Sequence, residues 1–282
     1  MKTSKFVSRV YLFLILLFLF APIFVLIFFS FNADKSTSVF GGFSFRWYRN
    51  LFEDEAALSA LRNSLVLAVT SGAIATVMGT FAAYGISRMR RKYLRTAIMS
   101  VTNIPMMNPD IITGISLMLM FVFVGAMLGL SESLSFATML IAHVTFGLPY
   151  VIMSVLPKFN QMDKSMPEAA LDLGCTPLQS FFKVELPEIM PGVMTGGIMA
   201  FTMSLDDFVI SLFTKGSSFQ TLPLYIYGMT KKSVSPKIYA LATIIFFAIL
   251  ILLLITNFIS AKDEKTQAKL NRSLRRADGQ TK

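Results

Sequence analysis

Cysteine and histidine are almost absent from this chain of 282 residues, which holds one of each, Cys175 and His143. A single cysteine forms no intrachain disulfide, and the pair supplies too few soft ligands for the usual metal sites. Charge is also scarce, since 15% of the residues are charged against about 25% in soluble domains. We therefore expect no metal, no cofactor and no catalytic residue.

Apolar residues, by contrast, are abundant. They make up 54% of the chain and include 27 Phe and 18 Met. Apolar runs of about 20 residues predict membrane-spanning helices, so we predict an all-α membrane protein with six transmembrane helices. The third run holds Pro105 and Pro109, and we expect either a kink there or a helix that starts below the hydrocarbon. The predicted spans are about 10–31, 61–86, 97–128, 134–156, 192–213 and 238–260.

The first apolar run resembles a secretory signal, because basic residues precede it. A signal peptide has an apolar region of about 7–15 residues and a small-residue cleavage site. The run from Val10 to about Phe31 is longer, and no Ala-x-Ala follows it. We therefore predict an uncleaved first span.

Basic residues predict the orientation of the spans. In a soluble protein a net charge of +10 would suggest nucleic acid, but here most of the Lys and Arg residues lie in segments on one side of the predicted membrane. Because basic residues favour the cytoplasmic side, both termini are predicted to be cytoplasmic and no nucleic acid is expected. These segments are the N-terminus, the 87–96 loop, the polar hairpin 157–191 and the charged tail 261–282 that follows the transmembrane domain 1–260.

Two loops on the other side of the predicted membrane are rich in aromatic and apolar residues. Residues 32–60 hold Trp47 and several Phe residues, a mixture typical of the membrane–water interface, and 214–237 is too apolar for a solvated coil. Two interpretations stay open, resting on the mouth of the helix bundle and contact with an external partner. Tyr225 and Tyr227 are either interface aromatics or rings that stack on an ammonium group.

The polar hairpin carries helix-start and helix-stop signals. Ser165 and Glu168 have the spacing of a capping box, and Gly174 supplies a left-handed stop after about two turns. Thr176, Pro177 and Gln179 repeat the start signal. The sequence therefore predicts two short helices that meet at Gly174. Because such helices are marginal alone, they need something to pack on, either a partner protein or the membrane surface.

The hairpin resembles the coupling motif of permease subunits in ATP-binding-cassette (ABC) importers. The residues that carry the resemblance are Glu168, Ala169, Ala170, Gly174, Leu186 and Pro187. Three further stretches, at 107–112, 143–149 and 204–211, resemble the spermidine/putrescine branch of these permeases. The resemblance implies a type I importer fold in a bacterial cell membrane, with this chain forming half of the pore.

Partners follow from the same resemblance. It implies a homologous second permease subunit, an extracytoplasmic polyamine-binding protein and cytoplasmic ATPase subunits that receive the coupling helix. The chain has no Gly-x4-Gly-Lys-Ser/Thr phosphate loop, so it is predicted to be a transport subunit rather than an enzyme, and its ATP must be hydrolysed elsewhere.

Three carboxylates, Asp110, Asp206 and Asp207, fall inside the predicted spans. Each acid costs about 2.5–3.5 kcal/mol at the bilayer centre and normally faces a cavity or a partner. Asp110 lies 15 residues after Arg95 and Asp206 lies 15 after Pro191, which places both about 22 Å from the cytoplasmic side. With no basic residue of this chain at that depth, the acids suit a multivalent cation.

Other roles for these residues stay open. Asp206 and Asp207 point about 100° apart on a helix, so we expect one of them, with Asp206 favoured, to face the pathway; pairing with a basic residue of a neighbouring subunit is the alternative. Asp110 is either a helix cap or a pathway residue. His143 is either an interhelical hydrogen-bonding residue, which we favour, or a proton relay.

Three other functions compete with polyamine import. The same machine with another organic cation or small solute as cargo is the first. A stand-alone ion-coupled transporter or channel would use Asp110 and Asp206 as its ion site. A membrane enzyme would need a nucleophile or metal beside His143, and the sequence offers neither convincingly.

Overall fold

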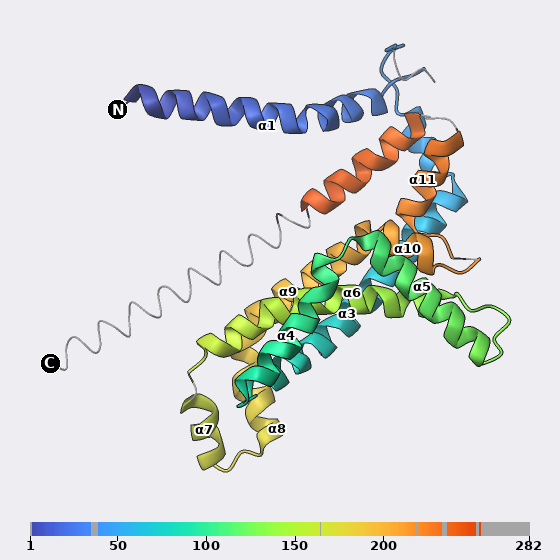
Figure 1. Ribbon diagram of the computed structural model, residues 1–282. Helices are drawn as coiled ribbons and strands as arrows, with labels where there is room; N and C mark the ends of the chain where they lie inside the picture. Colours follow the sequence, from blue (N-terminus) through green and yellow to red (C-terminus); the bar gives the residue numbers. More distant parts are fainter. Residues whose placement is uncertain are drawn as a thin grey trace. The chain divides into compact units, whose positions relative to one another are not determined.

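The computed structural model describes residues 2–34, 39–163, 165–217, 219–232, 236–251 and 254 (Figure 1). Within these residues the protein is built of helices, and its one β-feature is an isolated bridge between Asn32 and Phe43. The predicted all-α fold class is therefore confirmed. In chain order, the helices include α1 (Lys2–Ser30), α2 (Arg46–Phe52), α3 (Glu55–Ser87), α4 (Lys92–Met107), α5 (Asp110–Met127), α6 (Phe136–Gln161), α7 (Ser165–Asp172), α8 (Pro177–Ser180), the π-helix η1 (Phe181–Glu185), α9 (Leu186–Asp206), α10 (Val209–Thr214) and α11 (Leu222–Lys232).

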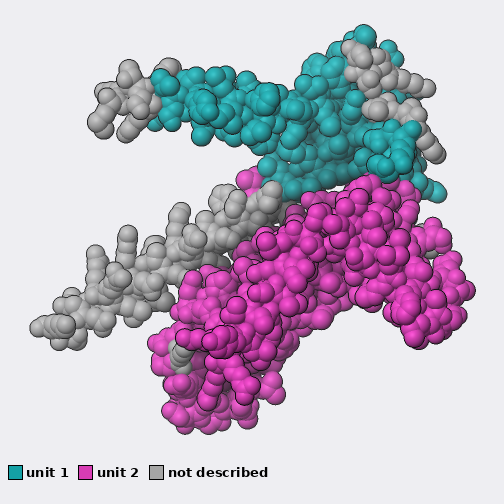
Figure 2. All heavy atoms as spheres, viewed as in Figure 1, with its two compact units in different colours: residues 1–60, 225–253 teal, residues 61–224, 254–282 magenta. Residues whose placement is uncertain are grey.

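The chain divides into two compact units, drawn in different colours in Figure 2. Unit 1 comprises residues 1–60 and 225–253, and unit 2 comprises 61–224 and 254–282. The coupling-motif residues and the three membrane carboxylates all belong to unit 2.

Four helices in the described part of the chain are long and apolar enough to cross a membrane. They lie within α1, α3, α5 and α6, and a shorter apolar helix spans Pro236–Ile251. The window within α1 has a mean hydropathy of 3.2 and buries none of its residues inside the protein. Its side chains therefore need an apolar environment from outside the chain.

The predicted third span, 97–128, consists of two helices rather than one. α4 ends at Met107 and α5 begins at Asp110, with extended backbone at Asn108 between them. Proline disfavours a helical conformation in the residue before it, so Pro109 accounts for the break. Pro105 lies inside α4, and the predicted kink is thus placed at Pro109.

The expectation of a continuous helix over 192–213 is wrong. α9 begins earlier, at Leu186, and ends at Asp206; α10 begins at Val209. The backbone of Asp207 is extended, with φ −64° and ψ 125°. This break divides the predicted fifth span at the two adjacent carboxylates.

Small residues let the helices of unit 2 pack closely. Every fourth residue of α9 from Gly192 to Ser204 is small and buried, a spacing that places these residues on one face. A methyl group at Gly192 would lie 2.8 Å from the carbonyl oxygen of Ser154 on α6, and one at Gly196 would lie 3.0 Å from Val151 Cα. α6 and α9 therefore contact each other through their backbones, and the core between them is built around residues such as Val151 and Ile189.

Unit 1 is held together by a short polar network and an aromatic cluster. The indole of Trp47 donates to the Asn32 carbonyl at 2.7 Å. Asp54 accepts hydrogen bonds from Lys237 and from Tyr225, the latter at 2.6 Å. Burial on its own raises the pKa of Asp54, but the hydrogen bonds from Lys237 and Tyr225 outweigh it and lower that pKa to about 2. Aromatic residues of the 32–60 loop pack on each other, as in the edge-to-face pair Phe43 and Phe45.

Candidate functional site

The predicted polar hairpin is formed by α7, α8 and η1, and α7 ends as expected. Gly174 has a φ of +90°. Its amide donates to the Leu171 carbonyl at 2.9 Å, and the Cys175 amide donates to the Ala170 carbonyl at 3.0 Å. These two bonds define a Schellman motif, which needs a residue that tolerates the left-handed conformation. The predicted stop at Gly174 is confirmed.

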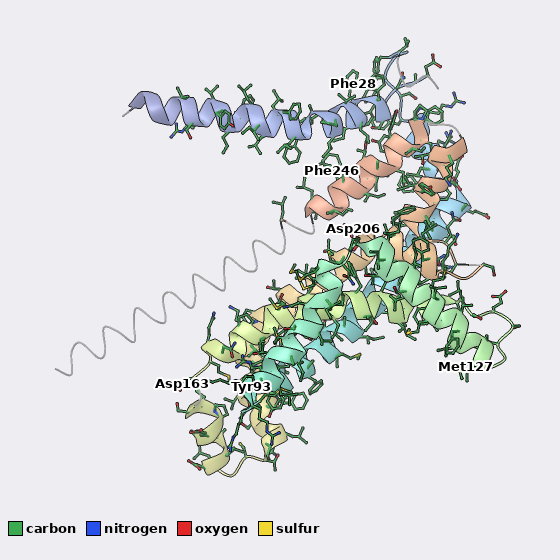
Figure 3. The ribbon with its side chains drawn as sticks, viewed as in Figure 1. Phe28, Tyr93, Met127, Asp163, Asp206 and Phe246 are labelled. Carbon is green, nitrogen blue, oxygen red and sulfur yellow. The ribbon has the colours of Figure 1, made fainter. Side chains whose placement is uncertain are left out.

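The two predicted helix starts have different outcomes. At α8, Gln179 N donates to Thr176 Oγ1 at 3.3 Å and Thr176 N donates to Gln179 Oε1 at 3.0 Å, so that capping box is confirmed. At α7, Ser165 is the first helical residue, and its amide donates to Asp163 Oδ1 at 3.0 Å. The predicted Ser165–Glu168 capping box is wrong, because the Asp163 carboxylate, labelled in Figure 3, takes the capping role two residues earlier.

The hairpin folds upon itself and leaves an apolar outer face. Pro167 and Ala170 of α7 are buried where α7 contacts α8 and η1. Ser180 Oγ donates to the Pro167 carbonyl at 3.5 Å. Outside this contact, Leu173 is 87% exposed and Leu178 is 69% exposed. Large apolar side chains presented next to the turn form a surface suited to docking on another molecule.

The coupling-motif residues are distributed between the inner and outer faces. Glu168 and Ala169 are exposed, while Ala170 is buried. Leu186 and Pro187 are the first two residues of α9. Because η1 leads from α8 into α9 without a loop, the hairpin continues directly into a long helix of unit 2.

One ion pair ties the hairpin to α3. Arg88, immediately after α3, donates from Nη2 to Glu185 Oε1 at 2.7 Å. The Glu185 side chain is 2% exposed. Its hydrogen bond raises the pKa of Arg88 above the ordinary value, an effect that burial partly opposes. The sequence did not single out either residue, since a lone Glu near a span end and an Arg in a basic loop carry no local signal.

The break between α9 and α10 is built by Asp207. Its carboxylate accepts from the amides of Ile210 at 3.2 Å and Ser211 at 2.7 Å. These bonds satisfy amides that a new helix leaves unpaired. The Asp207 side chain is 7% exposed, so this acid is committed to the helix restart.

The neighbouring Asp206 has a different environment. It is exposed at the last residue of α9 (Figure 3). In the part of the chain that the structure describes, no Lys or Arg nitrogen lies within 4.0 Å of its carboxylate. The two adjacent acids therefore differ in exposure, the Asp207 side chain being buried in the helix break and Asp206 exposed.

A buried polar network surrounds the break. His143 on α6 places Nδ1 2.7 Å from Ser204 Oγ and Nε2 3.0 Å from Ser211 Oγ. Ser204 Oγ also lies 2.9 Å from Ser71 Oγ on α3, and Asp207 Oδ2 lies 3.5 Å from His143 Nε2. The favoured prediction of an interhelical histidine is confirmed. The serines were not predicted, although Ser204 continues the four-residue spacing of small residues on α9.

Asp110 is the first helical residue of α5 and therefore does not occupy the N-cap position that a role as helix cap predicts. The residue before the helix is Pro109, which has no side-chain cap bond, and Asp110 itself is exposed. A carboxylate in the first turn is favoured by the helix dipole. The Asp110 carboxylate therefore interacts with α5 through the helix dipole rather than through a cap hydrogen bond.

The two tyrosines of α11 are already engaged within unit 1. The hydroxyl of Tyr225 bonds Asp54 at 2.6 Å. The ring of Tyr227 has Lys231 Nζ at 4.6 Å from its centroid. The ring of Tyr227 thus stacks on an ammonium group, and that group belongs to this chain.

Solved structures of ABC transporters share this fold. A bacterial ABC transporter involved in the import of the acidic polysaccharide alginate aligns with a TM-score of 0.71 at 19% identity, over 93% of this chain and 99% of that one. The MetNI methionine ABC transporter aligns with a TM-score of 0.56 at 18% identity, over 73% and 97%. At these identities the likeness shows the fold alone, which is that of a type I importer permease.

Sequence comparison defines the family. Residues 75–262 match the family described as "Binding-protein-dependent transport system inner membrane component", and the chain belongs to this family. It is thus a multi-pass membrane protein. The putrescine transport system permease protein PotI of Escherichia coli K12 is 38% identical over 252 residues, 89% of this chain and 90% of PotI. The spermidine/putrescine permease PotC of Haemophilus influenzae is 36% identical over 258 residues, 92% and 98% of the two chains.

Proposed function

We propose that this chain forms half of the translocation pore of an ATP-driven importer of spermidine or putrescine. The observation that carries the proposal is its identity of 38% to PotI and 36% to PotC along about nine tenths of each chain. In this proposal the chain has six membrane crossings, and both termini and the coupling hairpin are cytoplasmic.

A polyamine is an aliphatic chain that carries several ammonium groups. Its passage needs carboxylates that are not already paired with a Lys or Arg side chain. Asp206 meets this requirement, because it is exposed and has no Lys or Arg within reach among the described residues. Asp110 is exposed in the same way at the start of α5. We assign both to the substrate pathway, while Asp207 shapes the break that presents Asp206.

The coupling hairpin would connect this chain to the ATPase, which is the motor of the importer. Glu168, Ala169, Ala170 and Gly174 would form the helix that enters a groove of the ATPase, with Leu173 and Leu178 at its apolar edge. Leu186 and Pro187 would pass the movement into α9. The other partners are a homologous second permease subunit and an extracytoplasmic polyamine-binding protein.

Uptake by the assembled importer in proteoliposomes tests the cargo. We expect ATP-dependent accumulation of radiolabelled putrescine or spermidine, which an excess of either unlabelled polyamine abolishes. Competition by choline serves as the matched control, because choline carries a single quaternary ammonium group. If polyamines fail to compete while another organic cation does, the machine is retained and the polyamine assignment is wrong.

A further inference from the structure

The cytoplasmic end of α3 and the coupling hairpin meet at one cation. Arg88 follows the last residue of α3, and its guanidinium carbon lies 5.3 Å from the centroid of the Tyr84 ring, one turn earlier on that helix. The Arg88 side chain is 52% exposed. Its Nη2 reaches inward, 2.7 Å from Glu185 Oε1, and the ring of Tyr84 limits the directions that the guanidinium can take.

Glu185 depends on that cation. Its side chain is 2% exposed, and its Oε2 is buried with no hydrogen-bond partner among the described residues. A buried carboxylate that loses its partner is strongly destabilised, because its charge remains away from water. The lowest-energy position of η1 is therefore the one that brings Glu185 to Arg88.

An aromatic contact joins the hairpin to α3 beside this ion pair. The ring of Phe181 in η1 stacks on Phe81 of α3 with centroids 5.6 Å apart. The hairpin is thus attached at the end of α3 by one charged and one apolar contact.

The Glu185 end of the ion pair lies in η1, the part of the hairpin that joins α9. Residues Phe181–Glu185 form a π-helix, a wider turn that is uncommon and concentrated at functional sites. Glu185 is the last residue of that turn, directly before Leu186 of the coupling motif. The ion pair thus fixes the hairpin at the point where its movement enters α9.

We propose that Arg88 is a positioning residue for energy coupling, which holds the hairpin in a fixed orientation at the end of α3 through Glu185. With the pair intact, α3, α9 and the hairpin move together when the motor closes. Without it, the hairpin still docks but rotates about η1, and ATP is hydrolysed without moving the spans. This inference rests on the proposed function for its cargo and on the structure for its geometry.

The first experiment measures the ATP hydrolysed per polyamine imported by the assembled importer in proteoliposomes. For Arg88→Gln we expect the ratio to rise about tenfold, within the usual range of coupling between sites, while the ATPase stays bound. Arg90→Gln is the matched control, because it removes one positive charge from an exposed neighbour in the same loop. The reciprocal variant R88E/E185R should recover most of the coupling. An unchanged ratio in Arg88→Gln, or no recovery in the reciprocal variant, overturns the proposal.

The second experiment measures orientation and needs neither cargo nor ATP. Nitroxide labels on the native Cys175 in the hairpin turn and on Val77→Cys, which is 57% exposed on α3, report the distance between the two elements in the full-length chain in nanodiscs. We expect a narrow distribution that broadens with Arg88→Gln and narrows again in the reciprocal variant. A distribution that stays narrow in Arg88→Gln contradicts the proposal. Should Arg88→Gln fail to insert, Arg88→Lys tests the same point, since Lys keeps the charge but loses the planar guanidinium.

The two experiments separate this inference from the proposed function. If the wild-type importer moves no polyamine, the cargo is wrong, and the distance measurement still tests the orientation of the hairpin. If polyamine uptake is normal but Arg88→Gln changes neither the coupling ratio nor the distance distribution, the function stands and the positioning role is refuted.

Discussion

The imidazole of His143 and the hydroxyl of Ser204 lie 2.7 Å apart, joining α6 to α9 just before α9 ends. The other ring nitrogen lies 3.0 Å from Ser211 of α10. One side chain therefore contacts the helix on each side of the break. The break is fixed by buried hydrogen bonds, and this explains how exposed Asp206 keeps its position at the end of α9.

Replacing His143 by Leu removes both bonds and leaves the buried Ser211 hydroxyl without its histidine partner, whereas Ser204 keeps its bond from Ser71. An unsatisfied buried polar group costs about 1–3 kcal/mol, so we expect a clearly lower thermal unfolding temperature in detergent. Thr145→Val is the control, because Thr145 is exposed on the same helix and bonds only the Ile141 carbonyl. Equal unfolding temperatures for the two variants would show that the network does not stabilise the break.

Replacement by Ala should affect stability at Asp207 and transport at Asp206. Loss of the Asp207 cap should lower stability by about 0.5–2 kcal/mol. Asp206→Ala should leave unfolding unchanged and slow polyamine uptake, because it removes an unpaired carboxylate from the proposed pathway. Thermal unfolding and radiolabelled uptake on both variants check this. Normal uptake by an assembled Asp206→Ala importer would remove that residue from the pathway.

At Gly174 the left-handed backbone predicts a graded effect. Gly174→Val forces a β-branched side chain into a conformation that costs ordinary residues about 1–2 kcal/mol, and we expect it to insert normally but lose ATPase binding. Gly174→Asn is the control, since Asn tolerates this conformation. Pull-down of the ATPase measures the difference. Equal recovery with both variants would separate the turn from docking.

Close packing of α6 and α9 predicts that Gly192 and Gly85 differ in their tolerance of Ala. Gly192→Ala would place a methyl group 2.8 Å from the Ser154 carbonyl oxygen, so the helices must move apart. Gly85→Ala meets nothing within 4 Å and should be neutral or stabilising by up to about 1 kcal/mol. Thermal unfolding of the two variants measures the difference in stability. A stability loss in Gly85→Ala alone would contradict the close packing of α6 and α9 at Gly192.

Local signals in the sequence predicted most of the local structure of the hairpin, with the Ser165–Glu168 capping box as the exception. The stop at Gly174 and the capping box at Thr176 depend on neighbouring residues, and both form. The break at Asp207 was missed because a continuous apolar run hides a helix restart that only its side-chain bonds reveal. The Arg88–Glu185 pair joins residues far apart in the chain, and no spacing rule predicts such a contact.

Coupling of transport to a separate motor is the central claim, and one measurement tests it directly. Both permease subunits are placed in liposomes with the binding protein, with and without the ATPase and ATP, and accumulation of labelled polyamine is followed. We predict accumulation only when the ATPase and ATP are present, and its loss in the Gly174→Val variant. Accumulation of the same extent without the ATPase would contradict the account.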